Sequence, residues 1–245
     1  NESYGLKNDY YSVSDRKQLE NGNWQCKITI DLDEYFGQLN RLKEQYKGKL
    51  DLRIGVEIGL QKHLGEAYHR LTEAYPFDFV IGSVHLVGGQ DPYYRKIFEG
   101  RTDEEVYRMA FREILENVEA VKDFDALGHL DYVVRYGIHQ AAEYSYRKFS
   151  DEIDAVLKKL IAEGKGLEMN LAGIKYGLGF PNPHPDVLKR YRELGGEIIT
   201  IGADAHEPAH VAYEFEKATE ILRECGFSYY AEFHGRKPVF QRIVP

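Results

Sequence analysis

Short apolar segments that resemble β-strands alternate with amphipathic helical segments along most of this sequence, and this alternation restricts the fold more than any other feature. Strands are predicted at residues 50–58, 77–85, 124–129, 167–171, 197–202 and 229–233. Helices are predicted at residues 31–46, 63–75, 102–122, 144–162, 185–194 and 208–225. Such alternation is typical of parallel strands covered by helices. The expected fold class is therefore α/β.

Side chains that can bind metals stand at the ends of these predicted strands. The strand ends are Gly-Val-Glu-Ile-Gly, Ile-Gly-Ser-Val-His, Leu-Gly-His-Leu-Asp and Ile-Gly-Ala-Asp-Ala-His, which carry Glu57, His85, His129, Asp204 and His206. The parallel strands of an α/β barrel bring their C-terminal ends together at one mouth. Donors far apart in the sequence can therefore share one ion.

Each of these residues alone has an ordinary explanation, because a single Glu at a strand end can form an ion pair and a single His can be a core residue. Their combination favours a metal. Glu57 and Asp204 about 4 Å apart would repel each other by roughly 4 kcal/mol at an effective dielectric constant of about 20, and a divalent cation would remove that repulsion. Mixed His and carboxylate ligands suit Zn, Mn or Fe better than Mg or Ca. The pattern indicates a metal-dependent hydrolase.

Composition excludes several other classes of protein. Among the 245 residues the net charge is −8 and basic residues are scattered, so nucleic acid is not expected as the main partner. The sequence lacks both a long apolar run and a signal-peptide pattern, and two cysteines are too few for a disulfide framework. We expect no membrane span and a cytoplasmic location. The 19 tyrosines are compatible with either pocket walls or half-buried helix surfaces.

The motifs around Glu57, Gly-Ser-Val-His85, Gly-His129-Leu-Asp, Glu-Met-Asn170 and Gly-Ala-Asp204-Ala-His206 resemble those of the polymerase and histidinol phosphatase (PHP) superfamily. The resemblance extends from about residue 31 to the C-terminus, and residues 167–227 are most similar to the histidinol-phosphate phosphatase branch. It implies one domain over residues 31–245, a distorted TIM-like (β/α)7 barrel that holds up to three ions of Zn, Mn or Fe. The implied reaction is hydrolysis of L-histidinol phosphate to L-histidinol and phosphate, in histidine biosynthesis.

The resemblance also implies a role for each metal-binding residue. Glu57 would bridge two metals, one of which His85 and His129 also hold. Asp204 would ligate the other bridged metal, and His206 would ligate a third.

Further residues would contact the phosphorylated substrate. The resemblance implies that Arg135 binds phosphate and stabilises its oxygens during transfer, and that Lys175 and Asn170 also bind substrate. For Arg135 or Lys175 taken alone, a surface role is an equally open alternative. His206 would protonate the leaving alkoxide, unless a water does so. Asp131 and Glu168 are candidates for recognising the amine and imidazole of histidinol, and Asp131 could instead orient His129.

The sequence also departs from the family pattern. The opening His-x-His strand of the family is absent, so the chain is expected to begin after the second barrel strand and to be a fragment of a longer protein. Residues 1–30 are polar and are expected to form a surface loop or lid. A barrel without its first strands would have two unpaired edges, which proteins normally avoid.

Three alternatives remain open at this point. The first is another phosphoesterase of the superfamily that acts on nucleotides or sugar phosphates. The second is a degenerate domain that binds one structural ion and serves in assembly. The third, a metal-free sugar-binding barrel, leaves the Asp-Ala-His motif unexplained. The oligomeric state is not predicted.

Overall fold

The computed structural model describes residues 30–244 and, before them, only the backbone of two short strands. These are β1 (Arg16–Gln18) and β2 (Trp24–Cys26), which pair in antiparallel fashion. The other residues of the predicted loop or lid, up to residue 29, lie outside the described part of the chain.

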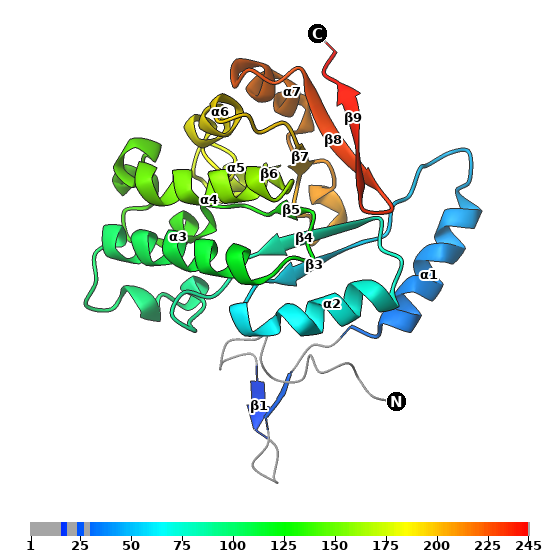
Figure 1. Ribbon diagram of the computed structural model, residues 1–245, viewed down its shortest axis with the longest axis horizontal. Helices are drawn as coiled ribbons and strands as arrows, with labels where there is room; N and C mark the ends of the chain where they lie inside the picture. The colour runs from blue at the N-terminus through cyan, green and yellow to red at the C-terminus, as the bar shows by residue number, and fades with distance from the viewer. Residues whose placement is uncertain (1–15, 19–23, 27–29, 245) are drawn as a thin grey trace.

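A five-stranded parallel sheet forms the centre of the molecule, with its strands side by side in chain order (Figure 1). The strands are β3 (Gly55–Gly59), β4 (Phe79–Ser83), β5 (Ala126–Leu127), β6 (Gly166–Asn170) and β7 (Ile199–Gly202). All four pairings between neighbouring strands are parallel, so the carboxyl ends of the strands lie at one edge. The predicted α/β class is confirmed.

Helices lie around the outside of this sheet (Figure 1). They are α1 (Leu32–Gln45), α2 (Gly65–Ala74), α3 (Asp103–Ala120), α4 (Ser150–Ala162), α5 (Ala172–Lys175), α6 (Pro185–Glu193) and α7 (Phe215–Glu224). Helix α3 begins with a capping box, in which Thr102 accepts a hydrogen bond from the Glu105 N–H and the Glu105 side chain accepts one from the Thr102 N–H. None of the helices in the described residues is long and apolar enough to cross a bilayer.

The predicted elements differ from the structure mainly near the C-terminus. The helix predicted at residues 208–225 is instead a short 3-10 turn, Pro208–His210, followed by α7, because Ala212 and Glu214 have positive φ angles that interrupt a helix. The last predicted strand, β8 (Tyr229–His234), pairs with a strand that the sequence did not predict, β9 (Lys237–Arg242).

The described strands form an open sheet rather than a closed ring. Among residues 30–244 the parallel sheet ends at β3 on one side and at β7 on the other, with the β8–β9 hairpin beside β7 (Figure 1).

Two carboxylates at the amino ends of the strands hold the β8–β9 turn against the sheet. Asp78 precedes β4 and accepts hydrogen bonds from the Ile54 and Gly235 N–H groups, at 2.9 and 3.1 Å. Asp125 precedes β5 and accepts from the Val80 N–H at 2.8 Å and from Arg236 Nε at 2.6 Å. The Asp125 side chain is only 7% exposed, so its charge depends on these partners.

We therefore expect Arg236→Ala to destabilise the protein by about 2 kcal/mol, because it leaves a buried carboxylate without its cation. Urea denaturation followed by circular dichroism would measure the change. Arg242→Ala, at an exposed arginine of the same hairpin, is the control and should have little effect. Equal stability of the Arg236 and Arg242 variants would contradict this role of the Asp125–Arg236 pair.

Candidate metal and phosphate site

Three of the predicted ligands meet at the carboxyl edge of the sheet. Glu57 lies in β3, His85 follows β4 and His129 follows β5. Glu57 Oε1 is 3.1 Å from His129 Nε2 and 3.3 Å from His85 Nε2, and the two Nε2 atoms are 3.3 Å apart. Within the described residues this is the group of three donors found close enough together to share an ion.

The spacing of these three atoms fits a metal better than it fits hydrogen bonds. Ligand atoms about 2.0–2.1 Å from a tetrahedral zinc ion are about 3.3 Å from one another. If both histidines donated Nε2–H to Glu57, the two N–H groups would also face each other, and this contact would be repulsive. A divalent cation lets all three atoms act as acceptors.

The electrostatics of the three residues also suit a cation. Burial lowers the pKa of His129, which favours the neutral imidazole that a metal requires. Burial opposes ionisation of Glu57, but hydrogen bonds to His129 and His85 hold the pKa of that carboxyl well below its usual range. Burial lowers the pKa of His85, but Glu57 and, less strongly, Asp91 and Asp204 raise it above its ordinary value.

Strand β6 supports His129 through Glu168. The buried Glu168 carboxylate accepts hydrogen bonds from the His129 backbone N–H and from Asn170 Nδ2, both at 3.1 Å. Burial raises the pKa of Glu168 to about 7. Gly202 of β7 leaves the space that this carboxylate fills, since a methyl group there would overlap it. His129 itself has a φ of 21°, an uncommon value for a residue other than glycine.

Arg135 contacts the same aromatic ring as the two histidines, that of Tyr132. The Tyr132 centroid is 4.9 Å from that of His129 and 5.2 Å from that of His85, and Arg135 Cζ is 5.1 Å from the same centroid. Tyr176 also stacks on the guanidinium, at 4.8 Å. The Arg135 side chain is 2% exposed, and its buried Nη2 has no hydrogen-bond partner among residues 30–244. A buried cation with a free donor is a candidate binding point for an anion.

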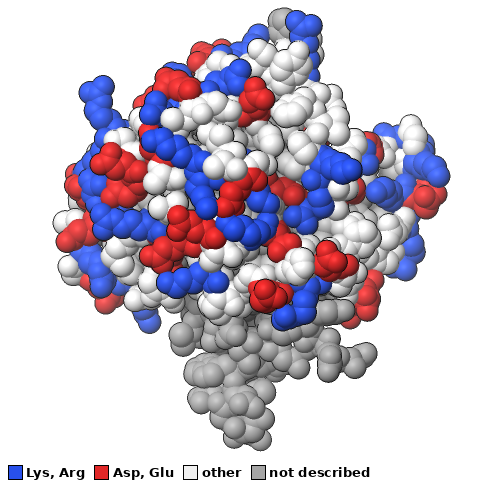
Figure 2. Space-filling view, in the orientation of Figure 1, with Lys and Arg blue, Asp and Glu red and all other residues white. Residues whose placement is uncertain are grey.

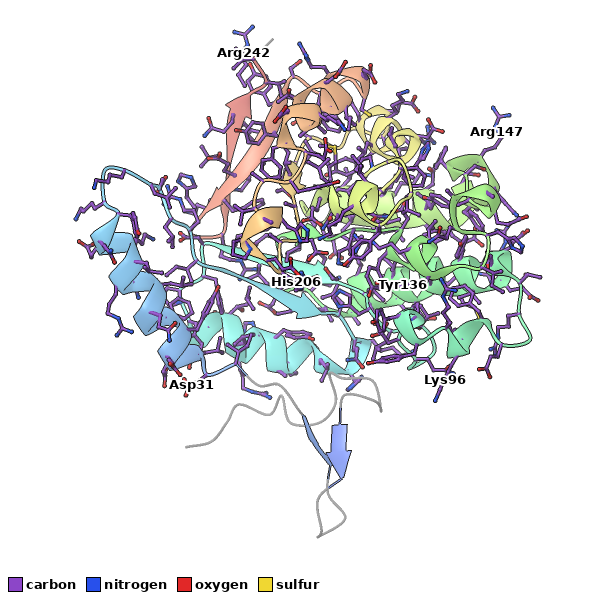
Figure 3. All side chains as sticks on the ribbon, turned by 180° about the vertical axis from the view of Figure 1, so that it is seen from behind. Asp31, Lys96, Tyr136, Arg147, His206 and Arg242 are labelled. Atoms are coloured by element: carbon purple, nitrogen blue, oxygen red, sulfur yellow. The ribbon has the colours of Figure 1, made fainter. Side chains whose placement is uncertain are left out.

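Asp204 lies beside this arginine and His206 lies beside Asp204, and neither belongs to the three-donor group. Asp204 Oδ2 is 3.5 Å from Arg135 Nη1, and Asp204 Oδ1 is 3.5 Å from His206 Nδ1. The His206 side chain is 78% exposed. The labels of His206 and Tyr136 both lie toward the centre of the view in Figure 3. Metal ligation by Asp204 and His206, and proton donation by His206, stay predictions.

The remaining substrate candidates have other neighbours. Lys175 Nζ lies 5.2 Å from the Tyr176 centroid, on the same ring that Arg135 contacts. The Asn170 amide hydrogen-bonds within the protein at both ends, to Glu168 and to the Ala172 N–H. The substrate roles of Lys175 and Asn170 stay predictions.

Asp131 is placed differently from both of its predicted roles. It is fully buried, and its carboxylate accepts from Asn182 Nδ2 and from the His184 N–H. Because both oxygens are engaged inside the protein, they do not face a substrate amine, and no hydrogen bond to the His129 ring is found among the described residues. Its link to Arg135 through Asn182 was not predicted.

Sequence reasoning also missed the aromatic side chains around the site. Tyr132, Tyr136 and Tyr93 form a continuous row, with centroid separations of 5.0 and 5.9 Å. The abundance of tyrosine had raised the possibility of pocket walls. The position of Tyr132 and Tyr136, four residues apart and close to Arg135 in sequence, was the signal that could have identified two of them.

Comparison with known proteins gives one family. The sequence profile described as "PHP domain" matches residues 8–172. A Clostridium acetobutylicum protein named "Probable histidinol-phosphatase" is 32% identical over 87% of this chain and 78% of its own length. A Lactococcus lactis protein named "Histidinol-phosphatase" is 31% identical over 86% of this chain and 78% of its own length.

A solved structure shows the same similarity. The crystal structure of histidinol phosphate phosphatase from Lactococcus lactis, complexed with Zn, L-histidinol and phosphate, superposes with a TM-score of 0.76. The two chains are 28% identical, and the match covers 87% of this chain and 81% of the other.

We expect Glu57→Gln to lower the affinity for Zn²⁺ by more than about 100-fold, because it removes the anionic ligand, whereas changes outside the ligand shell already cost about 10- to 100-fold. Competition with a chromogenic chelator would give the affinity. Glu66→Gln, at an exposed position of α2, should bind Zn²⁺ like the wild type. An unchanged affinity in Glu57→Gln would exclude this carboxylate as a ligand.

Proposed function

This chain belongs to the PHP domain family, and from that membership we propose that it is a metal-dependent phosphomonoesterase that hydrolyses L-histidinol phosphate to L-histidinol and phosphate. The observation that carries the proposal is the placement of a buried arginine with an unpartnered Nη2, among the described residues, beside three metal-type donors. The reaction belongs to histidine biosynthesis, which we expect to take place in the cytoplasm.

Glu57, His85 and His129 would hold a divalent metal, for which we propose Zn, with Mn or Fe as substitutes and up to three ions in all. Such a cation would stabilise charge on the phosphoryl oxygens and lower the pKa of a water molecule toward about 7. The bound Zn of the Lactococcus lactis enzyme supports the choice of metal.

The protein's own side chains would bind and orient the phosphate. Arg135 offers Nη2 as a donor that has no other partner among the described residues, and its burial strengthens its attraction for a phosphate dianion. Tyr132 and Tyr176 both contact the guanidinium through their rings and help to shield it from water. Lys175 also contacts the Tyr176 ring and would add a second positive charge.

Glu168 would hold the metal-binding part of the site in place, and Asp204 would hold the part that binds phosphate. Glu168 fixes the backbone of His129, and Asp204 lies near Arg135 Nη1 and His206. Proton donation to the leaving alkoxide is assigned to His206, whose Nδ1 faces the Asp204 backbone oxygen at 3.1 Å and whose ring is accessible to solvent.

A small phosphorylated substrate also agrees with the distribution of charge. On the face shown in Figure 2, acidic and basic side chains are interspersed and no large patch of one sign is seen. Nucleic-acid binding would require a continuous basic face.

A second candidate is a domain that holds a single ion for structural reasons. It is favoured by one observation, which is that the described residues bring three donors together and leave Asp204 and His206 outside that group. Metal analysis separates the candidates, because two or three tightly bound ions favour the enzyme and one or none favours the structural role.

We expect Zn- or Mn-loaded protein to release phosphate from L-histidinol phosphate faster than from an aryl phosphate or a nucleotide. Arg135→Ala should lower kcat/KM by about 100- to 1000-fold, the usual cost of losing one donor to a developing anion. Arg135→Lys should recover only part of this loss, since lysine lacks the planar fork.

The matched control is Arg147→Ala, at an exposed arginine on the periphery in Figure 3, which should have wild-type activity. Absence of hydrolysis by the metal-loaded wild-type protein would contradict the proposed function.

A further inference from the structure

We propose that Asn182 is a positioning residue that orients the Arg135 guanidinium toward the site, and that Asp131 sets the orientation of the Asn182 amide. The inference rests on the proposed function, in which Arg135 binds the phosphate of the substrate. It concerns two residues that contact neither the three metal-type donors nor an accessible surface.

The three side chains form one buried chain of hydrogen bonds. Arg135 donates from Nε to Asn182 Oδ1 at 2.8 Å, and Asn182 donates from Nδ2 to Asp131 Oδ1. The second oxygen of Asp131 accepts from the His184 N–H at 2.9 Å. Arg135 is 4% exposed, and Asn182 and Asp131 are both fully buried, so water does not replace any of these bonds.

The direction of the Asn182 amide follows from its two neighbours. Arg135 Nε can only donate, and Asp131 Oδ1 accepts from the Asn182 Nδ2 group. The amide therefore has to present its oxygen to Arg135 and its nitrogen to Asp131. If the amide were reversed, donor would face donor at Arg135 and acceptor would face acceptor at Asp131, which in a buried site is costly.

The bond from Asn182 supplies a restraint that the aromatic rings do not. Tyr132 and Tyr176 stack on the guanidinium and fix its plane. A stacked guanidinium can still rotate within that plane. The bond at Nε fixes that rotation. With Nε turned toward Asn182, Nη1 faces Asp204 and Nη2 is left without a partner among residues 30–244, available to an incoming anion.

Asn182 is itself held on β6, the strand that supports His129. Its backbone N–H and C=O both pair with Asn170 at the end of β6, each at 2.8 Å. Gly173 leaves room for its side chain, since a methyl group at Gly173 would lie 2.8 Å from Asn182 Oδ1. The amide thus has little freedom to move away from Arg135.

Asp131→Asn gives the sharpest test, because it reverses the amide without removing Asn182. The His184 N–H belongs to the backbone and cannot turn, so the amide introduced at position 131 would give it the oxygen and face Asn182 with its NH2 group. Asn182 would then turn its oxygen toward position 131 and its NH2 group toward Arg135 Nε. The fork would be pushed out of position while its charge is unchanged.

The readout is the affinity of the Zn-loaded full chain for inorganic phosphate, measured by isothermal titration calorimetry. We expect Asp131→Asn and Asn182→Ala each to weaken phosphate binding by about 10- to 100-fold, as misplacement of a binding group does, with Zn²⁺ affinity unchanged. In an Arg135→Ala background the same changes should have less than about a twofold further effect, because they act through that arginine.

Asn117→Ala, which deletes another buried amide in α3, controls for a general loss of stability and should bind phosphate like the wild type. Wild-type phosphate affinity in both folded variants, or an equal loss in the Arg135→Ala background, would overturn the inference. A wild-type protein that binds no phosphate would overturn it as well. If Asn182→Ala does not fold, Asp131→Asn alone decides.

The proposed function can fail separately from this inference. Phosphate binding needs no turnover, so a protein that binds phosphate through a positioned Arg135 but does not hydrolyse L-histidinol phosphate would contradict only the substrate.

Discussion

Parallel pairing of β3 with β4 and of β4 with β5 is the constraint on which the site depends. In this register Glu57 lies opposite Ile81, and Gly82 lies opposite Leu127, so the three strands end close to one another. Each strand then needs only one suitable side chain at its end for three donors to meet. Their convergence is unfavourable without a cation, because two imidazole nitrogens and a carboxylate cannot all be satisfied by one another. The sheet therefore fixes the position of three donors whose arrangement suits a divalent cation.

The two edges of the sheet use carboxylates in opposite ways. At the amino edge, Asp78 and Asp125 receive backbone N–H groups, and Asp125 also receives the Arg236 side chain, so their charges are matched within the protein. At the carboxyl edge, Glu57 faces two histidines that are not obliged to carry a charge. In barrels of this kind the amino edge serves stability and the carboxyl edge serves chemistry. The carboxylates of this protein follow the same division, because those at the amino edge have partners within the protein and Glu57 at the carboxyl edge faces the candidate metal ligands.

The part of the site that could be predicted is the part that strands position directly. Glu57, His85 and His129 were identified because a strand has a regular direction and its end can be read from the sequence. The fold class followed from the same alternation. The helix predicted at residues 208–225 was wrong in its first half, since the positive φ angles of Ala212 and Glu214 have no clear signature in residues other than glycine.

The part that could not be predicted depends on where loops return. Asn182 lies in a loop after α5 and reaches Arg135 only because its backbone pairs with Asn170 at the end of β6. Asp131 was predicted either to recognise the substrate or to orient His129, yet its carboxylate turns toward Asn182 and His184. Neither connection has a periodic pattern, because each is a single long-range contact.

Strand β6 joins the two halves of the site, and this suggests how their geometry is kept mutually consistent. Through Glu168 it holds the backbone of His129, and through Asn170 it holds the backbone of Asn182, which in turn holds Arg135. Glu168 and Asn170 are themselves hydrogen-bonded to each other. All five residues of this strand are buried, so the support is rigid and shielded from water. A displacement of β6 would therefore move His129 and the Arg135 guanidinium together.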